Sequence, residues 1–377
     1  MKAEAFQMYD DGLNNKHEIA RRLYEAYPYD GKKESLTRLV ERWFSAKRIA
    51  EDHTGLAEEC EAAGVPIESV KHGWYKGEHW SIAFKTDNEG PSFERMLQDH
   101  IEDVKTHTFK YDKIKREKLN RPHLLLIDPA DVHIGKLALS FETGEDYNNQ
   151  IAVQRVRDGV DGIVEKAKSF EIEQIIFVAG NDILHIDTPR RTTTSGTPQD
   201  TDGMWYENFL IAKRLYVEII DKLLGIADVH FMYNPSNHDY TNGFFLADAI
   251  KSWYRDCQNI TFDVSIAHRK YYKYGSNLIC TTHGDGAKWD NLTKLMAAES
   301  NDWSGGFDSK QRRYVYTHHV HHKIVKDDIG VTIESLRSPS GTDSWHHRNG
   351  YQHAPKAVEG FIHDKLHGQV CRLTHLF

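Results

Sequence analysis

Polar side chains follow five predicted strands of this sequence, each close to the point where the strand ends. In "LLLIDPADVHIGK", residues 124–136, an apolar run leads to Asp131 and His133, which stand two residues apart. Because alternate residues of a strand point to the same side, we expect these two side chains to project together and bind one ion. The other polar side chains that follow predicted strands are Asp182, Asn237, His238, His283, His319 and His321.

Together these side chains predict a metal centre. A lone histidine at a strand end is more often structural, but five successive strand ends deliver polar groups to one rim, where open α/β sheets bind ligands. Carboxylate, amide and imidazole donors without thiolates suit Mn, Fe, Zn or similar ions. The four cysteines are scattered and form no C-x-x-C pair, so neither a zinc ribbon nor a disulfide framework is expected.

Alternating strands and helices must position these groups. Strand patterns at 123–128, 173–182 and 228–239 are separated by helix patterns at 149–170 and 207–227, which predicts an α/β fold with an at least partly parallel sheet. From residue 258 the chain becomes strand-rich, with predicted strands at 260–267, 269–275, 277–285, 312–319 and 330–337. We assign this α/β domain to residues 119–377.

Residues 1–118 have a different pattern and predict a small, mainly helical domain. Amphipathic helix patterns at 14–27 and 33–47 flank a break containing Pro and Gly, and a hairpin or wing is expected at 68–85. The pair is either a DNA-reading helix-turn-helix or a helical hairpin with solvated charges. Further helices are expected at 55–65 and 92–117. The basic run 105–121 is either a solvated linker or a phosphate-binding segment.

Composition indicates a folded protein without a membrane span. The chain has 377 residues, of which 39% are hydrophobic and 28% charged, and its formal net charge is −8. No apolar run reaches the roughly 18 residues of a spanning helix, and the N-terminus has no apolar segment resembling a secretion signal. We therefore expect a cytoplasmic location. The 23 histidines, many of them clustered, favour metal binding.

The order of the motifs resembles that of the calcineurin-like metallophosphoesterases. D-x-H at 131–133, G-N-D at 180–182, N-H-D at 237–239, the histidine at 283 and H-x-H at 319–321 carry the resemblance, which covers roughly residues 122–325. It would extend to the end of the chain if the last strands belong to a second sheet. The resemblance implies a sandwich of two mixed sheets flanked by helices.

The resemblance also implies two divalent metal ions, with Mn expected first and Fe, Zn or Mg as alternatives. One set of ligands would be Asp131, His133, Asp182 and His321, and the other would be Asp182, Asn237, His283 and His319. Asp182 would then bridge the two ions, which would activate a water for attack on phosphorus. The usual glycines are replaced by Ser236 and His318, and Asn181 separates Gly180 from Asp182. These departures affect the loops more than the ligands.

Catalytic roles are implied for three further residues. His238 matches a histidine that assists the leaving oxygen, with Asp239 as its expected orienting partner. His185 lies three residues after Asp182, a spacing similar to that in the DNA-repair exonuclease branch of the family, although it is equally compatible with a structural loop histidine. The phosphoprotein phosphatase motif G-D-x-V-D-R-G is poorly matched.

The surroundings of the site suggest how substrate would bind. Arg190 and Arg191 begin a polar loop, 188–203, that either contacts phosphates or is a disordered insertion. Trp345 is available to stack on a base, although we favour a role in capping the core. His346 and His347 would be ligands only if the motif assignment failed.

We therefore expect a two-metal nuclease that acts on nucleic acid, with DNA expected first, and leave exonuclease and endonuclease cleavage open. A helical head followed by this motif order resembles proteins carried by bacteriophages and prophages, which implies the cytoplasm of a bacterial host. Nucleic acid is the expected partner, and a homodimer or a protein partner for the N-terminal domain is also compatible with the sequence. The alternatives are a phosphomonoesterase, a cyclic-nucleotide phosphodiesterase, or a DNA-binding or assembly module with a structural metal site. A nuclease would show salt-sensitive binding and an open groove, whereas a nucleotide hydrolase would have a closed pocket.

Overall fold

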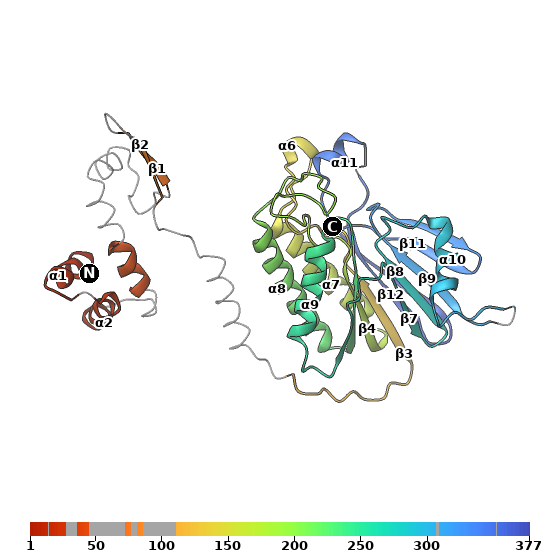
Figure 1. Ribbon diagram of the computed structural model, residues 1–377. Coiled ribbons are helices and arrows are strands. Elements are labelled where there is room, and N and C mark those ends of the chain that lie inside the picture. Colours follow the sequence, from red (N-terminus) through yellow and green to blue (C-terminus); the bar gives the residue numbers. More distant parts are fainter. Residues whose placement is uncertain are drawn as a thin grey trace. The chain divides into compact units, whose positions relative to one another are not determined.

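We describe the protein from a computed structural model. It defines residues 1–13, 15–27, 36–44, 111–306, 309–351 and 353–377, and the backbone of 72–76 and 81–85. The chain forms two compact units, Met1–Thr108 and Phe109–Phe377, each of which is described by itself (Figure 1). The predicted domain boundary, after residue 118, falls inside the second unit.

The first unit contains three described helices around a small apolar cluster. They are α1 (Lys2–Asp10), α2 (Lys16–Ala26) and residues 36–44. The Asn15 side chain caps α2 by accepting from two backbone N–H groups, and Leu23, Val40 and Phe44 are buried together. The two predicted amphipathic helices are confirmed. Helix α1 was not predicted, because Ala5 is its one buried residue and its sequence has little periodicity.

The predicted hairpin of the first unit is also confirmed, as β1 (His72–Lys76) pairs antiparallel with β2 (Ser81–Lys85). The helices predicted at 55–65 and over most of 92–117 lie outside the described residues. Residues 111–117, the described end of the second prediction, are not helical. The Ile114 N–H donates to Asn259 Oδ1, and Arg116 pairs with Asp228 at 3.0 Å. This segment of the basic run is therefore extended against its own unit.

The second unit is built on a six-stranded sheet whose middle strands are parallel. In spatial order the strands are β13 (Gly368–Leu376), β12 (Ala357–Asp364), β3 (Pro122–Asp128), β4 (Glu171–Gly180), β5 (Asp228–Asn234) and β6 (Ile260–Asp263). Strands β3 to β6 are parallel, and β12 is antiparallel to both of its neighbours. The parallel strands are joined through α7 (Asn149–Ala167), α8 (Trp205–Leu224) and α9 (Tyr240–Trp253).

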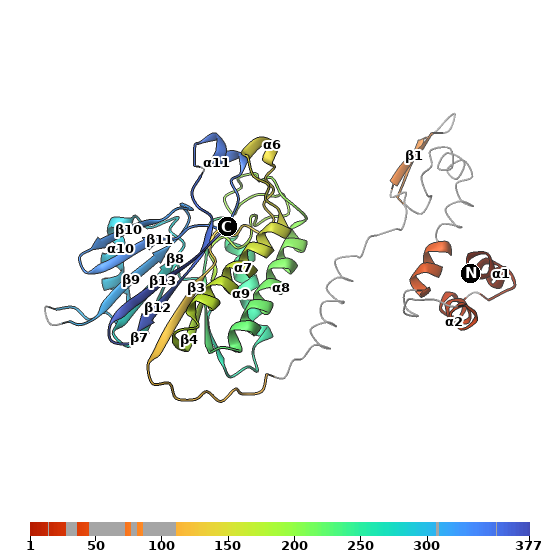
Figure 2. The ribbon, with the colours of Figure 1, turned by 180° about the vertical axis from the view of Figure 1, so that it is seen from behind.

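A second, five-stranded sheet packs against the first. Its strands, in spatial order, are β10 (Ile324–Asp328), β11 (Val331–Ser335), β9 (Arg312–Thr317), β8 (Asn277–Thr282) and β7 (Arg269–Tyr274). Strand β9 is parallel to both of its neighbours, and the two outer pairs are antiparallel. The views in Figures 1 and 2 show α7, α8 and α9 on the free face of the first sheet and α10 (Trp289–Glu299) on the free face of the second.

The alternation of side chains in β3 explains this layering. Leu124 and Leu126 face the second sheet, whereas Leu125 and Ile127 face the helices. A strand buried on both faces has to be apolar at every position, as this run is. The predicted α/β sandwich of two sheets flanked by helices is confirmed. The last two strands, however, join the first sheet beside β3 and not the second sheet.

Two short helices, α6 (Ser140–Thr143) and α11 (Ser344–Arg348), lie side by side at one end of the second unit in both views (Figures 1 and 2). In the described part of the chain, none of the helices combines the length and apolar character that a membrane span needs.

Candidate metal centre

Left-handed backbone, and not strand pleating, brings Asp131 and His133 together. Strand β3 ends at Asp128, so neither residue belongs to it, and both have φ of 52°. The prediction that they converge is borne out, but its geometric reason was wrong. Asn181, Asp182, His319 and His321 also have positive φ, between 50° and 72°. Such conformations cost non-glycine residues about 1–2 kcal/mol each and are found mainly where function requires them.

Backbone hydrogen bonds hold two of these loops side by side beyond the sheet. The N–H of Asp131 donates to Asn181 O and that of His133 donates to Asp182 O, at 2.8 and 2.9 Å. The next residues continue the pairing, with Ile134 N–H donating to Ile183 O. The loops after β3 and β4 therefore form one rigid support, which offsets the cost of the left-handed residues.

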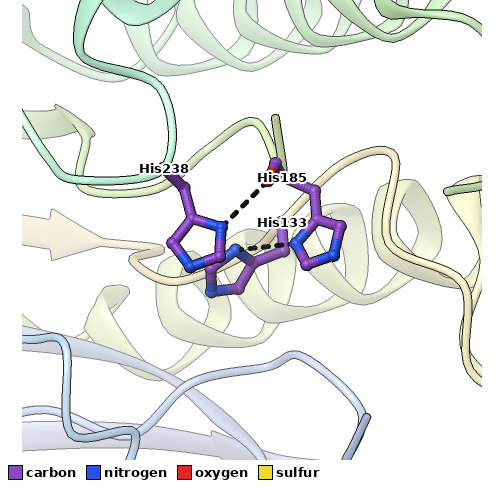
Figure 3. Close-up of side chains that lie close together, drawn as sticks. All are labelled: His133, His185 and His238. Carbon is purple, nitrogen blue, oxygen red and sulfur yellow. Dashed lines mark hydrogen bonds between the residues drawn. The ribbon is translucent and has the colours of Figure 1, made fainter. Parts of the chain in front are cut away.

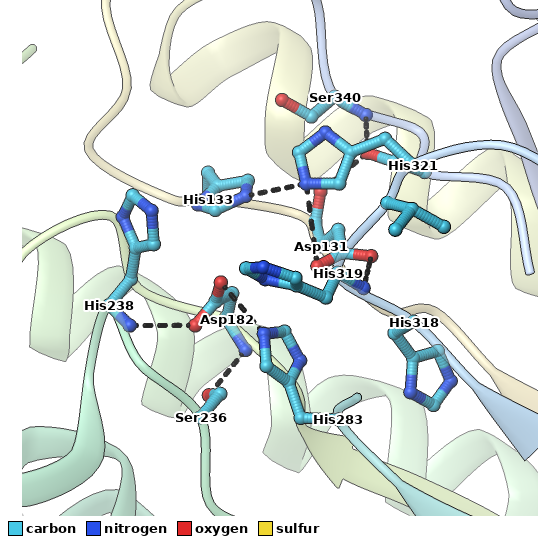
Figure 4. Close-up of polar contacts among 12 residues, drawn as sticks. Asp131, His133, Asp182, Ser236, His238, His283, His318, His319, His321 and Ser340 are labelled. Carbon is cyan, nitrogen blue, oxygen red and sulfur yellow. Dashed lines mark hydrogen bonds and ion pairs between the residues drawn. The ribbon is translucent and has the colours of Figure 1, made fainter. Parts of the chain in front are cut away.

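The first cluster of potential ligands is Asp131, His133 and His321 (Figure 4). Nε2 of His133 lies 3.3 Å from Nε2 of His321, which lies 3.5 Å from Oδ1 of Asp131. Two ligands about 2.1 Å from one ion would be about 3.0–3.4 Å apart. Oδ1 of Asp131 is buried without a hydrogen-bond partner among the described residues. The donors therefore fit a divalent cation.

The second cluster contains Asp182, His283, His319 and Asn237. Nε2 of His283 lies 3.2 Å from Asp182 Oδ2 and 3.0 Å from Asn237 Oδ1. The ligand atoms of Asp182, His283 and His319 all lie within 4.8 Å of one another. His319 is exposed, so the centre is open to solvent on this side. The structure thus brings all seven predicted ligands into two adjacent clusters, although bridging by Asp182 stays a prediction.

The electrostatics of the protein fit cation binding. Burial by itself would raise the pKa of Asp131, but His321 outweighs it and the pKa falls to about 2. Burial and then the neighbouring His238 lower the pKa of His133, which keeps it neutral as a ligand must be. Burial opposes a charge on His283, yet Asp182 raises its pKa to about 9. The proton on His283 thus compensates the same carboxylate that a metal ion would.

His185 contacts a candidate metal ligand directly (Figure 3). Its Nδ1 lies 3.4 Å from Nδ1 of His133, and it is 2% exposed. His133 can present a lone pair at Nε2 only if Nδ1 carries the proton, and His185 is placed to accept that hydrogen bond. Ligating histidines generally have such a partner. This contact fits a positioning role for His185, and the catalytic role, which the sequence left open beside a structural one, stays a prediction.

His238 is half-buried and stacks on His185 with the ring centroids 5.3 Å apart. The ring Nδ1 of His238 lies 2.9 Å from the backbone O of His185, and the backbone N–H of His238 donates to Asp182 Oδ1 at 2.9 Å. The prediction that Asp239 orients His238 is wrong. Both oxygens of Asp239 accept elsewhere, from Ser236 Oγ at 2.7 Å and from Leu184 N–H at 2.9 Å.

Residues that replace the usual glycines have structural roles. Ser236 Oγ accepts from the Asp182 N–H at 2.7 Å and donates to Asp239 Oδ1. It therefore fixes the loop that carries a candidate ligand. His318 is buried between Asp128, 2.9 Å from Nε2, and the backbone O of Thr282, 3.0 Å from Nδ1. It thereby connects the ends of strands from both sheets.

Lys136 was missed in the sequence. Its side chain is 1% exposed, and Nζ lies 2.8 Å from Asp343 Oδ2 and 3.0 Å from Ser340 Oγ. A buried lysine needs such partners. The glycine and lysine that follow the D-x-H motif were a visible signal, but the partners are about two hundred residues away, so sequence does not reveal them.

The 188–203 loop, which contains Arg190 and Arg191, is ordered, so the alternative of a disordered insertion is wrong. Asp187 anchors it, because the carboxylate accepts from Thr194 Oγ1 at 2.9 Å and from the backbone N–H groups at the start of α9. Both arginine side chains are exposed. Their phosphate contacts stay a prediction.

The predicted role of Trp345 as a cap on the core is also wrong, because its side chain is 61% exposed. It lies on α11 and stacks on Tyr351, with centroids 5.7 Å apart. His346 stacks on His321 at 4.9 Å, and its Nδ1 lies 2.7 Å from Asp343, so it is beside the first cluster and not in it. His347 is exposed.

No family model and no curated protein matches this chain. Among solved structures, an archaeal phosphodiesterase is similar at 9% identity and a TM-score of 0.32, covering 68% of this chain and 99% of its own. Vps29 of Entamoeba histolytica complexed with Zn²⁺ is similar at 9% identity and a TM-score of 0.28, covering 67% of this chain and 98% of its own. A putative 5′-nucleotidase of Staphylococcus aureus is similar at 11% identity and a TM-score of 0.31, covering 68% of this chain and 54% of its own. At such values the function of this chain has to be inferred from its own residues.

Proposed function

We propose that this chain is a metal-dependent phosphodiesterase that hydrolyses nucleic acid, with DNA as the expected substrate. The observation that carries the proposal is the pair of adjacent clusters of oxygen and imidazole donors, in which buried Asp131 Oδ1 has no other partner among the described residues. When bound, two divalent ions would polarise the phosphoryl group and supply an attacking hydroxide. Mn is the first expectation, with Fe, Zn and Mg as alternatives.

The residues of the chain would do the rest. His185 holds the ring of His133 in one orientation, and the two tied loops keep the ligand positions fixed before substrate arrives. With Nδ1 of His238 hydrogen-bonded to the His185 backbone O, Nε2 is the atom left to hold or pass a proton at the leaving oxygen. His238 is therefore the proposed catalytic acid.

Two features favour nucleic acid over a small monoester. His319 is exposed, so the centre is open to solvent, and the 188–203 loop reaches the second cluster, because the Thr194 N–H donates to the backbone O of Asn237 at 3.3 Å. The exposed side chains of Arg190 and Arg191 on this loop could bind a flanking phosphate. In the first unit, Arg38 and Arg42 are one turn apart and exposed on residues 36–44, as expected for a helix that contacts phosphates.

The proposal is tested by hydrolysis of linear double-stranded DNA, single-stranded DNA, bis-p-nitrophenyl phosphate and p-nitrophenyl phosphate, with Mn²⁺ and after chelation. We expect cleavage of DNA and of the diester, abolished by chelation and reduced more than about 100-fold in Asp182→Asn, which removes the charge of a proposed ligand. Asp248→Asn changes an exposed carboxylate on α9 and is the matched control.

Activity confined to p-nitrophenyl phosphate would replace the nuclease with a phosphomonoesterase. Hydrolysis of cyclic nucleotides without DNA cleavage would indicate a cyclic-nucleotide phosphodiesterase. If no phosphoester were cleaved although both ions were bound, the metal centre would be structural and the chain a binding or assembly module.

A further inference from the structure

A cavity of about 280 Å³ opens beside the first cluster of the metal centre. Its walls come from the loop after β9, which includes His321 and His322, and from a later part of the chain. The lining residues of that later part are Gly341, Thr342, His346, Gly350, Tyr351, His353, Ala354 and Lys356. His321 belongs both to the cavity wall and to the first cluster, so whatever occupies the cavity lies next to the reacting phosphate. The volume is close to the lower end of the roughly 300–1,000 Å³ of small-ligand sites, enough for one nucleotide.

The cavity wall favours an anionic ligand. It contains His321, His322, His346, His353 and Lys356, and no aspartate or glutamate is among the described residues that line it. Nearby carboxylates are already compensated. Asp343 pairs with Lys136 and His346. Glu145 accepts from the Thr342 N–H and pairs with Arg155 at 3.6 Å and, more distantly, with Lys356 at 3.8 Å. A phosphate would therefore enter without facing an unpaired negative charge.

One exposed aromatic ring lines the cavity, and a second ring stacks on the first. Tyr351 is 64% exposed and lines it, and Trp345 stacks on Tyr351 at an interplanar angle of 29°. Leaving two large rings in water forgoes the roughly 1.5–3 kcal/mol that burial of each would contribute, so an exposed pair calls for a ligand. Imidazole, lysine and exposed aromatic side chains together are the composition of a surface that binds single-stranded nucleic acid.

The position of this aromatic pair is fixed by the same contacts that support the metal centre. Asp343 caps α11 by accepting from the backbone N–H of His346 at 2.8 Å, and buried Lys136 forms an ion pair with Asp343. Ser344 Oγ donates to Glu142 Oε1 of α6 at 2.6 Å. The ring of His346 stacks on that of His321. The helix that carries Trp345 is therefore held against a proposed metal ligand.

We propose that the cavity and the Trp345–Tyr351 pair form the specificity site for one nucleotide of a single-stranded end, immediately next to the scissile phosphate. The base stacks on the aromatic pair, and a phosphate lies against His353 and Lys356. A base inside a duplex is already stacked on both faces, so only an unpaired or frayed end can bind in this way. This inference rests on the proposed nuclease function and adds its substrate class.

The test compares Trp345→Ala and Tyr351→Ala with Phe141→Ala. Phe141, on neighbouring α6, is a fully exposed aromatic residue that neither lines the cavity, as Tyr351 does, nor stacks on Tyr351, as Trp345 does. Each protein is assayed with a short single-stranded oligonucleotide and with one of equal length whose bases are replaced by abasic residues. Fluorescence anisotropy gives the Kd after chelation, and Mn²⁺-dependent cleavage gives KM and kcat.

We expect the two cavity variants to raise both Kd and KM for the base-bearing oligonucleotide about 10-fold or more, since stacking contributes about 1–3 kcal/mol per base. The kcat of both variants on the base-bearing oligonucleotide should stay within about twofold of wild type. Their Kd, KM and kcat for the abasic oligonucleotide should also stay within about twofold. For Phe141→Ala we expect all of these values, on both oligonucleotides, to stay within the same limit. Equal losses on both oligonucleotides, or no loss, would overturn the base-binding site and leave the aromatic pair as a surface for protein contacts. If wild type cleaved neither oligonucleotide nor duplex DNA, the nuclease proposal itself would fail.

Discussion

The contact between His185 and His133 gives the sharpest prediction about metal binding. His133 needs a proton on Nδ1 to direct a lone pair at Nε2 toward the first cluster, and Nδ1 of His185, 3.4 Å away, is its acceptor. His185→Leu places an apolar side chain of similar bulk at this buried position and removes the acceptor. His185→Asn places an amide oxygen near the position of Nδ1 and is the matched variant.

The magnitude can be estimated in two ways. A buried N–H group left without a partner costs about 1–3 kcal/mol, equivalent to about 5- to 150-fold in an equilibrium constant. Loss of a hydrogen-bond partner to a ligating histidine weakens metal binding about 10- to 100-fold. We therefore expect His185→Leu to bind the first ion about 10- to 100-fold more weakly, whereas the cluster around Asp182 and His283 keeps its affinity.

The assay is isothermal titration of chelator-treated protein with Mn²⁺, followed by elemental analysis after dialysis. Wild type and His238→Ala should retain two ions, because the His238 ring contacts the backbone O of His185 and no ligand ring by hydrogen bond. His185→Leu should retain one, and His185→Asn should lie between. Wild-type affinity for both ions in His185→Leu would refute the positioning role and restore the catalytic one that its sequence spacing suggested.

Two further predictions concern the framework of the site and the pH dependence of stability. A Cβ at Gly180, where φ is +80°, would lie 2.2 Å from the backbone O of Asn234, so Gly180→Ala should lower the free energy of unfolding by more than about 2 kcal/mol and reduce metal content. Urea unfolding and elemental analysis check this, and unchanged stability would contradict it. Burial lowers the pKa of His363 from 6.5 to about 3, so the unfolded chain takes up the proton first and stability is lost as pH falls from about 6.5 toward 3. His363→Gln should make that loss shallower by up to about 1.4 kcal/mol per pH unit in urea unfolding at pH 6 to 4, and parallel curves would show that His363 contributes nothing.

The arrangement of strands, helices and ligands could be predicted because it depends on local patterns. Buried apolar runs followed by polar residues identify the ends of β3, β4, β5, β8 and β9, and the rim of an α/β sheet brings such ends together. The backbone conformation at those ends was not predictable. Aspartate and histidine adopt positive φ more often than most other non-glycine residues, but still only in a small minority of cases. Residue type alone therefore does not distinguish an extended Asp131–His133 segment from the left-handed one that the structure has.

Contacts that residue type and order do not reveal account for the remaining errors. Trp345 looks like a core residue by type, but the Lys136–Asp343 pair fixes α11 at the rim, and this pairing joins residues far apart in the chain. Similarly, Asp239 precedes α9 and follows His238 directly, yet its carboxylate points to Ser236 and Leu184. Neighbours in sequence are poor guides to hydrogen-bond partners where the backbone turns sharply.

The left-handed residues of the metal centre also bear on how the sequence can vary. Five of the seven proposed ligands, Asp131, His133, Asp182, His319 and His321, stand at positions where glycine would relieve backbone strain. Selection for folding stability alone would therefore drive these positions toward glycine or asparagine, and only the demand for metal binding opposes that drift. Stability and the proposed metal binding are thus in direct conflict here, and stabilising substitutions should be sought elsewhere in the chain.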